Sequence, residues 1–363
     1  MRSRIRSIFR RLETEVDLVV VANGTYPHVD MCFYYATGLD HGLFEGSLAL
    51  ISPQGLEIIT SLLEGESARH PEADVTVYKE RKERAGILRE RLSGCRRIGI
   101  DPPELTHKWY KELSAAAPKG ARLIDVSKAL MAARLVKDRA EVSRMRRACR
   151  IAAEAASEII PELREGVREY EVSAGLTYLM QQRGASGPAF DTIVAFGKMS
   201  AEPHYVAGDA KLRRGEIVLL DFGALYRRYR SDITRTYIFG RATPKQKEMY
   251  ELVLDAQTAA LRRMKPGVKG GDVHRAAERR ISRSRFKGRF THAVGHSIGL
   301  ATHDGSGLHP SIPLTLEPGM IFTVEPGVYL PGYGGVRIED DVLITKDGCE
   351  VLTPAPKELI EVS

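Results

Sequence analysis

Five residues whose side chains bind metal ions follow one another through the second half of the chain. They are four carboxylates and one imidazole: Asp221, Asp232, His296, Glu325 and Glu339. Each stands in a short segment that predicts a strand or a tight turn, with glycine nearby. A set this rich in oxygen suits two adjacent divalent ions such as Mn, Co or Zn better than one tetrahedral structural zinc. Two ions about 3.5–4 Å apart would hold a shared water as hydroxide and clamp a substrate carbonyl.

The two aspartates flank a predicted hairpin. A turn centred near Tyr226-Arg227 would set Asp221 and Asp232 opposite each other. Like charges in that position repel, and buried carboxylates without a partner are costlier still. The adjoining runs VLL and YIF predict burial. A divalent cation between the carboxylates is therefore favoured over a solvated hairpin with two chance aspartates.

The surroundings of the remaining three candidates favour the same interpretation. His296 lies between glycines, which let backbone and ligand approach closely. Glu325 ends the apolar run MIFTV, where an acid is out of place unless it binds something. Glu339 could belong to an acidic turn with the two acids that follow it. The preceding V-R-I alternation instead predicts a strand with Arg337 and Glu339 on the same face.

At these residues the chain resembles the metallopeptidase family with the pita-bread fold, which includes Xaa-Pro dipeptidases (prolidases), aminopeptidase P and methionine aminopeptidase. The matching segments are LLDFGALYRRYRSDITRTY, THAVGHSIGLATHD, FTVEPGVY and GGVRIEDDVLI, in the family's order. The resemblance implies a small N-terminal α/β domain followed by a pita-bread α+β catalytic domain, whose two similar halves enclose a metal site. We expect the domains at residues 1–127 and 128–363, with a linking helix near 128–160.

The resemblance also implies roles for the metal-binding residues. Asp221 corresponds to a ligand of one metal only, while Asp232 and Glu339 correspond to carboxylates that bridge both metals. His296 and Glu325 correspond to ligands of the second metal. Glu325 also matches the family's general base, and a carboxylate beside the attacking water is placed for that task.

Four further residues resemble the family's substrate-side set. His204, in EPHY, resembles a histidine that contacts the scissile peptide, and His303, in ATHD, resembles one that polarises the carbonyl or steadies the tetrahedral intermediate. Arg337 resembles an arginine that fixes an acid and the substrate, and His292 a histidine lining the cleft. Each of the four could instead be an ordinary core or surface residue. The family often has His-Glu where this chain has His303-Asp304, which bears on specificity rather than on the metal site.

The activity implied is hydrolysis of the N-terminal Xaa-Pro peptide bond of dipeptides or short peptides by a dinuclear-metal peptidase with a metal-bridging hydroxide. Methionine aminopeptidases usually lack an N-terminal α/β domain, which favours prolidase or aminopeptidase P, and the choice between those two stays open. An aminopeptidase of different N-terminal specificity also fits the motifs. A non-catalytic peptide-binding module on the same fold would be expected to have lost ligands, and this chain keeps all five.

Composition limits the remaining possibilities. The 363 residues, 43% of them hydrophobic, suffice for two domains, and no apolar run is long enough to span a membrane. The net charge of +7 raises the question of nucleic acid, but the basic runs lack interleaved aromatic residues, so solvated faces are favoured. Four scattered cysteines without a CxxC pair predict a cytoplasmic protein without a disulfide framework.

Alternation and helical spacing predict the elements. The first domain is expected to hold a helix near 5–12, strands at 16–22, 47–51, 57–60 and 98–101, and helices at 80–93 and 105–117. The second is expected to hold helices at 170–184, 244–265 and 270–284, with strands up to 239 and over 290–352. In the second domain, a pair of helices followed by strands is expected to occur twice. This crude internal duplication fits the pita-bread pattern.

The segment 37–46 is predicted to be a loop, because it contains three glycines. It also carries Asp40, His41 and Phe44, which is an odd mixture for a plain connector. Prolidases of this type commonly form homodimers in which a loop of one N-terminal domain approaches the partner's active site. By resemblance we expect a homodimer in which Asp40 or His41 does so, although a mobile surface turn would also explain the segment.

Overall fold

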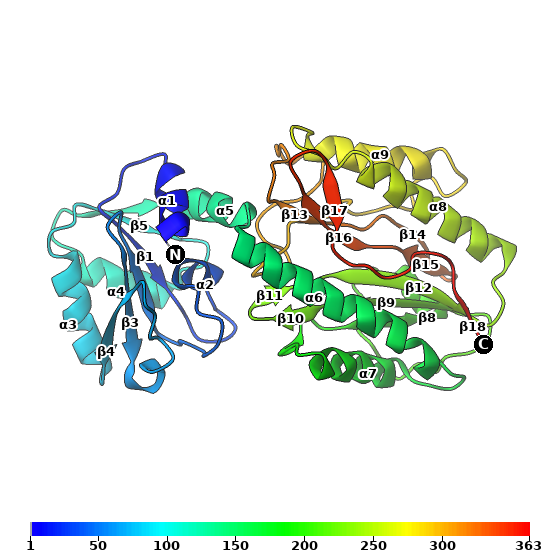
Figure 1. Cartoon of the computed structure of the whole chain (residues 1–363), viewed down its shortest axis with the longest axis horizontal. Helices are drawn as coiled ribbons and strands as arrows, with labels where there is room; N and C mark the ends of the chain where they lie inside the picture. Colours follow the sequence, from blue (N-terminus) through cyan, green and yellow to red (C-terminus); the bar gives the residue numbers. More distant parts are fainter. Residues whose placement is uncertain (1) are drawn as a thin grey trace. The chain divides into compact units, whose positions relative to one another are not determined.

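The computed structural model describes residues 2–363 and divides into two compact units, Met1–Arg134 and Leu135–Ser363. The first unit is built on a six-stranded sheet in the order β4-β3-β2-β1-β5-β6 (Figure 1). Its strands are β1 (Leu18–Ala22), β2 (Leu48–Ile51), β3 (Leu56–Ser61), β4 (Asp74–Tyr78), β5 (Arg97–Ile100) and β6 (Arg122–Asp125). Its helices are α1 (Arg2–Arg10), α2 (Met31–Thr37), α3 (Arg81–Leu92), α4 (His107–Ala116) and α5 (Ser127–Leu135), whose last residue already belongs to the second unit.

The central strands form from the apolar runs of the sequence. β1 and β2 are almost wholly buried and pair antiparallel, while β5 pairs parallel with β1. Helices α3 and α4 bury Leu88, Trp109 and Leu113 in the same core as Val20 and Leu48. The sequence did not predict β4, β6 or α2. β4 and β6 are the edge strands and are partly exposed, so they lack a long apolar run, whereas α2 is buried on nearly every side and shows no helical period.

The loop after α2 differs in part from its prediction. Phe44 is fully buried rather than presented on the surface, and it adopts a positive φ of 52°. The Asn23 side-chain amide donates to the Phe44 carbonyl at 2.9 Å and the Tyr34 hydroxyl donates to the Leu43 carbonyl at 2.7 Å. His41 is exposed and pairs with Asp40 at 2.9 Å. The loop is therefore anchored by an aromatic side chain and by hydrogen bonds, with His41 and Leu43 outside.

The second unit consists of two similar halves. In the first, α6 (Arg139–Glu158) and α7 (Glu169–Gln182) share a core with the sheet β18-β12-β9-β8. In the second, α8 (Pro244–Leu261) and α9 (Gly270–Ser282) share a core with strands β13 to β16. The helix pairs lie on opposite sides of the strands in Figure 1. The strands are β7 (Gly187–Pro188), β8 (Ile193–Phe196), β9 (Ile217–Phe222), β10 (Ala224–Tyr226), β11 (Tyr229–Arg230), β12 (Ile233–Phe239), β13 (Ile321–Val324), β14 (Gly327–Leu330), β15 (Gly334–Arg337), β16 (Asp340–Ile344), β17 (Cys349–Val351) and β18 (Glu361–Val362).

The predicted hairpin forms, but its register was wrong by two residues. The turn lies at Arg227-Arg228, both with positive φ, so Tyr226 pairs with Tyr229. Continued into β9 and β12, this register sets Asp221 opposite Thr234. Asp221 and Asp232 are thus diagonal neighbours on one face of the sheet rather than direct partners.

Two further expectations need correction. The linking helix expected near 128–160 is two helices, because Asp138 caps the start of α6 in a reciprocal capping box with Glu141. Strands were also expected to begin at 290, but residues 290–320 form only isolated bridges.

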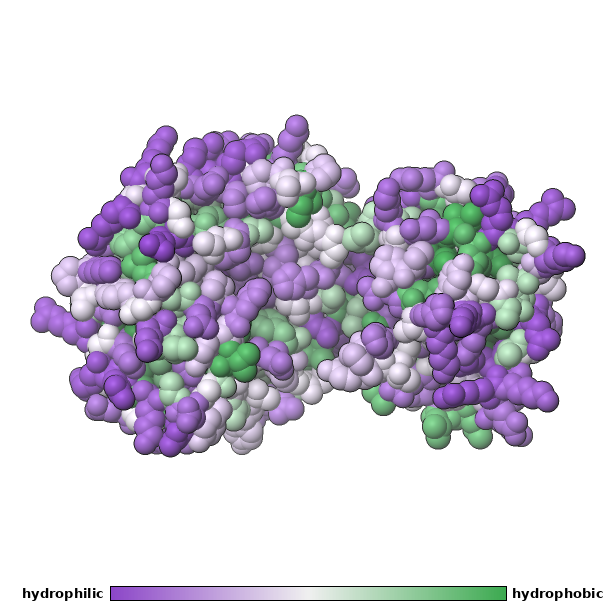
Figure 2. Space-filling view, turned by 180° about the vertical axis from the view of Figure 1, so that it is seen from behind, coloured by the Kyte–Doolittle hydropathy of each residue, from purple (hydrophilic) through white to green (hydrophobic). Residues whose placement is uncertain are grey.

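The surface face drawn in Figure 2 is mostly polar on both units, with apolar residues in small patches. Among residues 2–363, no helix is both long and apolar enough to cross a lipid bilayer. The four cysteines, Cys32, Cys95, Cys149 and Cys349, are free thiols.

Candidate metal centre

All five residues predicted to bind metal line one cleft of about 500 Å³ in the second unit. Asp221 lies in β9, Asp232 immediately precedes β12, Glu325 follows β13, and Glu339 immediately precedes β16. His296 belongs to the irregular segment beside β13, where the Thr323 backbone N–H donates to the His296 carbonyl at 2.8 Å. Strand ends from both halves therefore bring the five side chains together.

Two glycines make this convergence possible. A Cβ atom on Gly295 would lie 1.9 Å from the Thr323 carbonyl oxygen, so only glycine lets the His296 segment run this close to β13. A Cβ atom on Gly223 would lie 1.7 Å from the Ser231 carbonyl oxygen, between the two aspartates. Glycines near the site were expected from the sequence, and the structure gives these two a steric reason.

The geometry of the cluster suits metal binding. His296 Nε2 lies 3.6 Å from Asp232 Oδ2 and 3.6 Å from Glu325 Oε1. One ligand atom each from Asp232, His296 and Glu339 can be chosen so that all three lie within 4.8 Å of one another. Ligands that coordinate one ion at about 2.0–2.2 Å lie at most about 4.4 Å apart, and the two separations of 3.6 Å fall within that limit.

Unpaired oxygen atoms in the cluster provide the test of whether a cation fits. Asp221 Oδ1 and Asp232 Oδ1 are buried, and neither has a hydrogen-bond partner among residues 2–363. A buried carboxylate oxygen without a donor is costly, and such atoms are uncommon in native structures. The second oxygen of Asp221 accepts from Arg337 Nη2 at 2.5 Å. Divalent cations bound at the free oxygens would satisfy both aspartates, so the donor set fits the metals that its chemistry predicts.

The electrostatics of the cluster also call for added positive charge. Burial raises the pKa of Asp232 well above its usual value, and the charges of Glu339 and Asp221 raise it further. Burial likewise raises the pKa values of Glu339 and Glu325. Four carboxylates here face one buried guanidinium, that of Arg337. A divalent cation would stabilise the ionised forms of these carboxylates and so oppose the rise in their pKa values.

The substrate-side candidates line the same cleft. His204 and His303 are exposed at its wall, and the His303 ring lies 4.1 Å from the His296 ring, centroid to centroid. Burial, followed by the charge of His296, lowers the pKa of His303. A neutral imidazole is therefore available beside the predicted ligands.

Arg337 and His292 are connected through Tyr329, which sequence reasoning missed. Burial lowers the pKa of His292, so its ring is neutral near pH 7. Its Nδ1–H must donate to the Ala293 carbonyl at 2.8 Å, since a carbonyl only accepts. Nε2 then accepts from the Tyr329 hydroxyl at 2.9 Å, which in turn accepts from Arg337 Nη1 at 2.9 Å. The only sequence signal for Tyr329 was its place in the segment FTVEPGVY.

The remaining wall of the cleft is less polar. It includes Phe190, Ile193, Pro203 and Thr302, none of which the sequence motifs singled out. Phe190 and Ile193 lie outside the quoted motifs, while Pro203 and Thr302 stand inside EPHY and ATHD beside the two histidines, so only the tertiary structure assigns all four to the cleft wall.

Comparison with known proteins identifies the family of both units. Residues 143–346 match the model of metallopeptidase family M24, and residues 2–136 match that of the creatinase/prolidase N-terminal domain. The Xaa-Pro dipeptidase of Pyrococcus furiosus is 44% identical over 99% of this chain and 100% of its own.

Solved structures of similar enzymes superpose on nearly the whole chain. An Xaa-Pro dipeptidase from Bacillus anthracis superposes with a TM-score of 0.90 at 34% identity, over 99% of each chain. An X-Pro aminopeptidase from Thermotoga maritima superposes with a TM-score of 0.89 at 32% identity, over 96% of this chain and 98% of that one. The expected order of an N-terminal α/β domain and a pita-bread catalytic domain is confirmed. The chain belongs to metallopeptidase family M24.

Proposed function

We propose that this enzyme hydrolyses the N-terminal Xaa-Pro bond of dipeptides or short peptides with two divalent metal ions. The observation that carries the proposal is the set of buried, unpaired carboxylate oxygens of Asp221 and Asp232, two residues that line one cleft together with His296 and Glu339. The similar proteins named as Xaa-Pro dipeptidases and as an X-Pro aminopeptidase support the substrate class.

The proposed metal ligands divide between the two ions. Asp221 would hold one ion, His296 and Glu325 the second, and Asp232 and Glu339 would bridge them. When bound, Mn, Co or Zn ions would lower the pKa of a water molecule and polarise the substrate carbonyl. The pairing of Asp221 with Arg337 supports its assignment to a single ion, because one of its oxygens is already engaged.

The side chains around the proposed metal ions would transfer protons and bind the substrate. Burial raises the pKa of Glu325 above its usual value, and this direction of shift suits a general base. Thr323 Oγ1 donates to Glu325 Oε1 at 3.2 Å and thereby orients it. His303 and His204 would donate to the substrate carbonyl and to the scissile peptide, and Arg337, held by Tyr329, would fix the substrate.

A substrate panel tests the proposal. Purified protein is loaded with Mn²⁺ or Co²⁺ and assayed on Xaa-Pro, Xaa-Pro-Yaa and Xaa-Ala peptides, with Glu325→Gln as the inactive control. Hydrolysis of proline peptides above the alanine peptide supports the proposal, and the ratio of dipeptide to tripeptide rates separates prolidase from aminopeptidase P. Preference for Xaa-Ala would indicate a different aminopeptidase specificity. Binding of Xaa-Pro without hydrolysis would indicate a peptide-binding module.

Two further properties belong to the proposal. We expect a homodimer in which the loop 37–46 approaches the partner's cleft, and its exposed His41 and Leu43 support this role. Deletion of residues 39–44, followed by measurement of mass in solution and of both peptide rates, tests it. An unchanged rate ratio in an intact dimer contradicts it. The four free thiols support a reducing cytoplasm as the location.

A further inference from the structure

We propose that Thr234 and Asp341 are positioning residues that hold the two bridging carboxylates reciprocally. Thr234 stands two residues after Asp232 and holds Glu339, while Asp341 stands two residues after Glu339 and holds Asp232. The inference rests on the proposed function, since it takes Asp232 and Glu339 as metal ligands. It assigns a role to two residues that do not line the cleft.

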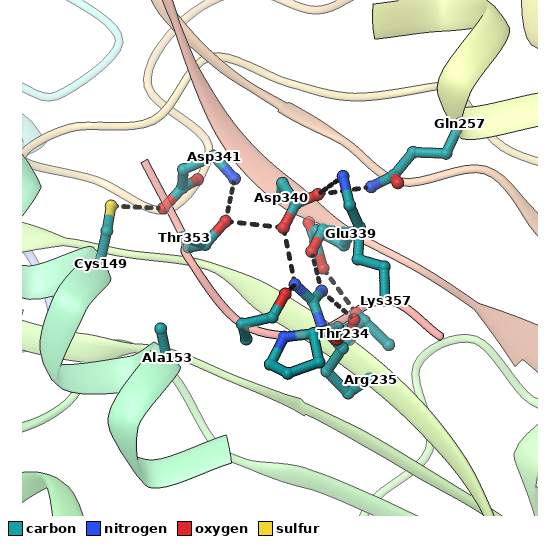
Figure 3. Close-up of polar contacts among 12 residues, drawn as sticks. Cys149, Ala153, Thr234, Arg235, Gln257, Glu339, Asp340, Asp341, Thr353 and Lys357 are labelled. Carbon is teal, nitrogen blue, oxygen red and sulfur yellow. Dashed lines mark hydrogen bonds and ion pairs between the residues drawn. The ribbon is translucent and has the colours of Figure 1, made fainter. Parts of the chain in front are cut away.

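The Thr234 hydroxyl orients the Glu339 side chain. Its Oγ1 lies 2.6 Å from Glu339 Oε2 and 3.0 Å from Arg337 Nε (the Thr234–Glu339 contact is drawn in Figure 3). Because Arg337 Nε–H only donates, the oxygen of Thr234 accepts there and its own proton goes to Glu339. Both neighbours thus fix the direction of the hydroxyl, and Thr234 is fully buried, so water cannot replace it.

The Asp341 carboxylate holds the backbone of Asp232. Its Oδ2 accepts the Asp232 N–H at 2.9 Å and the Cys149 S–H at 3.2 Å (the Cys149 contact is drawn in Figure 3). Asp232 lies just before β12, outside the ladder that β12 forms with β9, so this bond replaces a ladder partner at that position. Asp341 is fully buried and its own N–H donates to Thr353 Oγ1 at 3.2 Å.

A charged pair on the reverse face keeps the two strands in place. Arg235 donates to the Glu339 carbonyl at 2.6 Å and to Asp340 Oδ1 at 2.8 Å. Asp340 also accepts from Thr353, Gln257 and Lys357 at 2.8–2.9 Å (Figure 3). Since successive side chains alternate between faces, Arg235 and Asp340 cannot themselves reach into the cleft. Their hydrogen bonds hold β12 and β16 together, so that Thr234 and Asp341 stay within hydrogen-bond distance of Glu339 and Asp232.

Outer hydrogen bonds of this kind typically change metal affinity about 10–100-fold when removed. Thr234→Val keeps the volume and deletes the hydroxyl, so we expect the dissociation constant of Co²⁺ to rise at least about 10-fold. The visible absorption bands of the Co²⁺ protein should also change, because a reoriented Glu339 alters the ligand geometry. Thr234→Ser retains the donor and should stay near wild type in both measurements.

Asp341 is tested by the same logic. Asp341→Ala removes the acceptor for the Asp232 N–H and should weaken Co²⁺ binding by about 10-fold or more, while Asp341→Asn keeps an acceptor oxygen and should recover most of it. Thr60→Val is the matched control, since Thr60 is buried in the first unit and its hydroxyl also forms a 2.7 Å hydrogen bond, to Ser47. It should lose stability but keep Co²⁺ affinity and spectrum.

Titration of the wild-type protein with Co²⁺ distinguishes failure of the proposed metallopeptidase function from failure of the positioning role of Thr234 and Asp341. If wild-type protein binds no Co²⁺, the proposed function fails. If wild type binds Co²⁺ but folded Thr234→Val has the same affinity and spectrum, the positioning role of Thr234 is wrong. Thr234→Ser matching Thr234→Val, or Asp341→Asn matching Asp341→Ala, would also overturn the inference, because the hydrogen bond would then not be the cause. Should Asp341→Ala fail to fold, the Thr234 series still decides.

Discussion

The two units each contain a buried group of acidic and metal-binding side chains, and the two groups differ in how they are compensated. In the first unit, Asp30, Cys32 and Asp101 place ligand atoms within 4.8 Å of one another, as Asp232, His296 and Glu339 do in the second. Both trios could hold an ion by distance alone.

The first group already has protein partners. Asp30 caps α2 and accepts the Cys32 N–H at 2.7 Å, and Asp101 accepts the Cys32 S–H at 3.4 Å. Arg134 Nη1 lies 3.4 Å from the Cys32 sulfur and adds a positive charge. In the second group, by contrast, no donor among residues 2–363 reaches the buried Oδ1 atoms of Asp221 and Asp232. Unpaired oxygens of cleft-lining carboxylates, and four such carboxylates beside one guanidinium, therefore distinguish the proposed metal centre better than proximity does.

Replacing the two proposed bridging carboxylates should produce the largest effect. We expect Asp232→Asn and Glu339→Gln each to abolish peptidase activity and lower metal content, with folding retained because both side chains line a cleft beside a large core. Asp101→Asn, the counterpart in the first unit, should keep both metal and activity. Metal analysis and peptide assays check this, and equal metal loss in Asp101→Asn would show that the first group also binds metal.

The substrate-side histidines should show the next largest effect. His303→Ala and His204→Ala should each cut turnover by about two to three orders of magnitude, the range for a lost transition-state donor. Metal content should stay near normal, because neither side chain is among the proposed ligands. Loss of both ions in either variant would make that histidine a ligand instead.

The sequence predicted which residues gather in the cleft better than how they are arranged there. Apolar runs, glycines and the family resemblance singled out five residues that line one cleft in the structure: Asp221, Asp232, His296, Glu325 and Glu339. The hairpin register was wrong because a turn at Arg227-Arg228 requires positive φ at two arginines, for which no glycine or asparagine gave a signal. The edge strand β4 and the hydrogen bonds by which Tyr329 connects His292 and Arg337 depend on tertiary packing. Local sequence patterns carry no signal for such contacts.

Removing the positive charge of Arg134 beside Asp30, Cys32 and Asp101 should have a moderate effect on the stability of the protein. Arg134→Met keeps the stem but leaves Asp30 and Asp101 without this positive charge, so the free energy of unfolding should fall by about 1–3 kcal/mol. Chemical denaturation measures it, while peptidase activity of the folded protein serves as the control. An unchanged unfolding free energy would mean that Arg134 does not compensate this group.

The smallest expected effect is a pH dependence of stability that belongs to the first group. Burial, and then the charge of Asp101, raise the pKa of Asp30 from 3.8 to about 7, while the Cys32 N–H and Arg134 oppose the shift and Glu104 adds slightly to it. A carboxyl with a raised pKa in the folded state contributes stability below its unfolded pKa and loses it as pH rises through the folded pKa.

The contribution of Asp30 to the free energy of unfolding should therefore decline between about pH 4 and pH 7, and Asp30→Asn should make that decline smaller. Thermal melting across this range, on wild type and variant side by side, makes the measurement. A decline of the same size in Asp30→Asn would show that another group is responsible.

We expect divalent cations to complete the second group, and the number of metal ions bound per chain tests this expectation. Protein stripped with a chelator is dialysed against Mn²⁺, bound metal per chain is measured, and Xaa-Pro hydrolysis is followed on the same samples. We expect two ions per chain, loss of hydrolysis on stripping and its return with the metal. Protein that binds no divalent ion and hydrolyses the peptide equally well with chelator present would contradict the account.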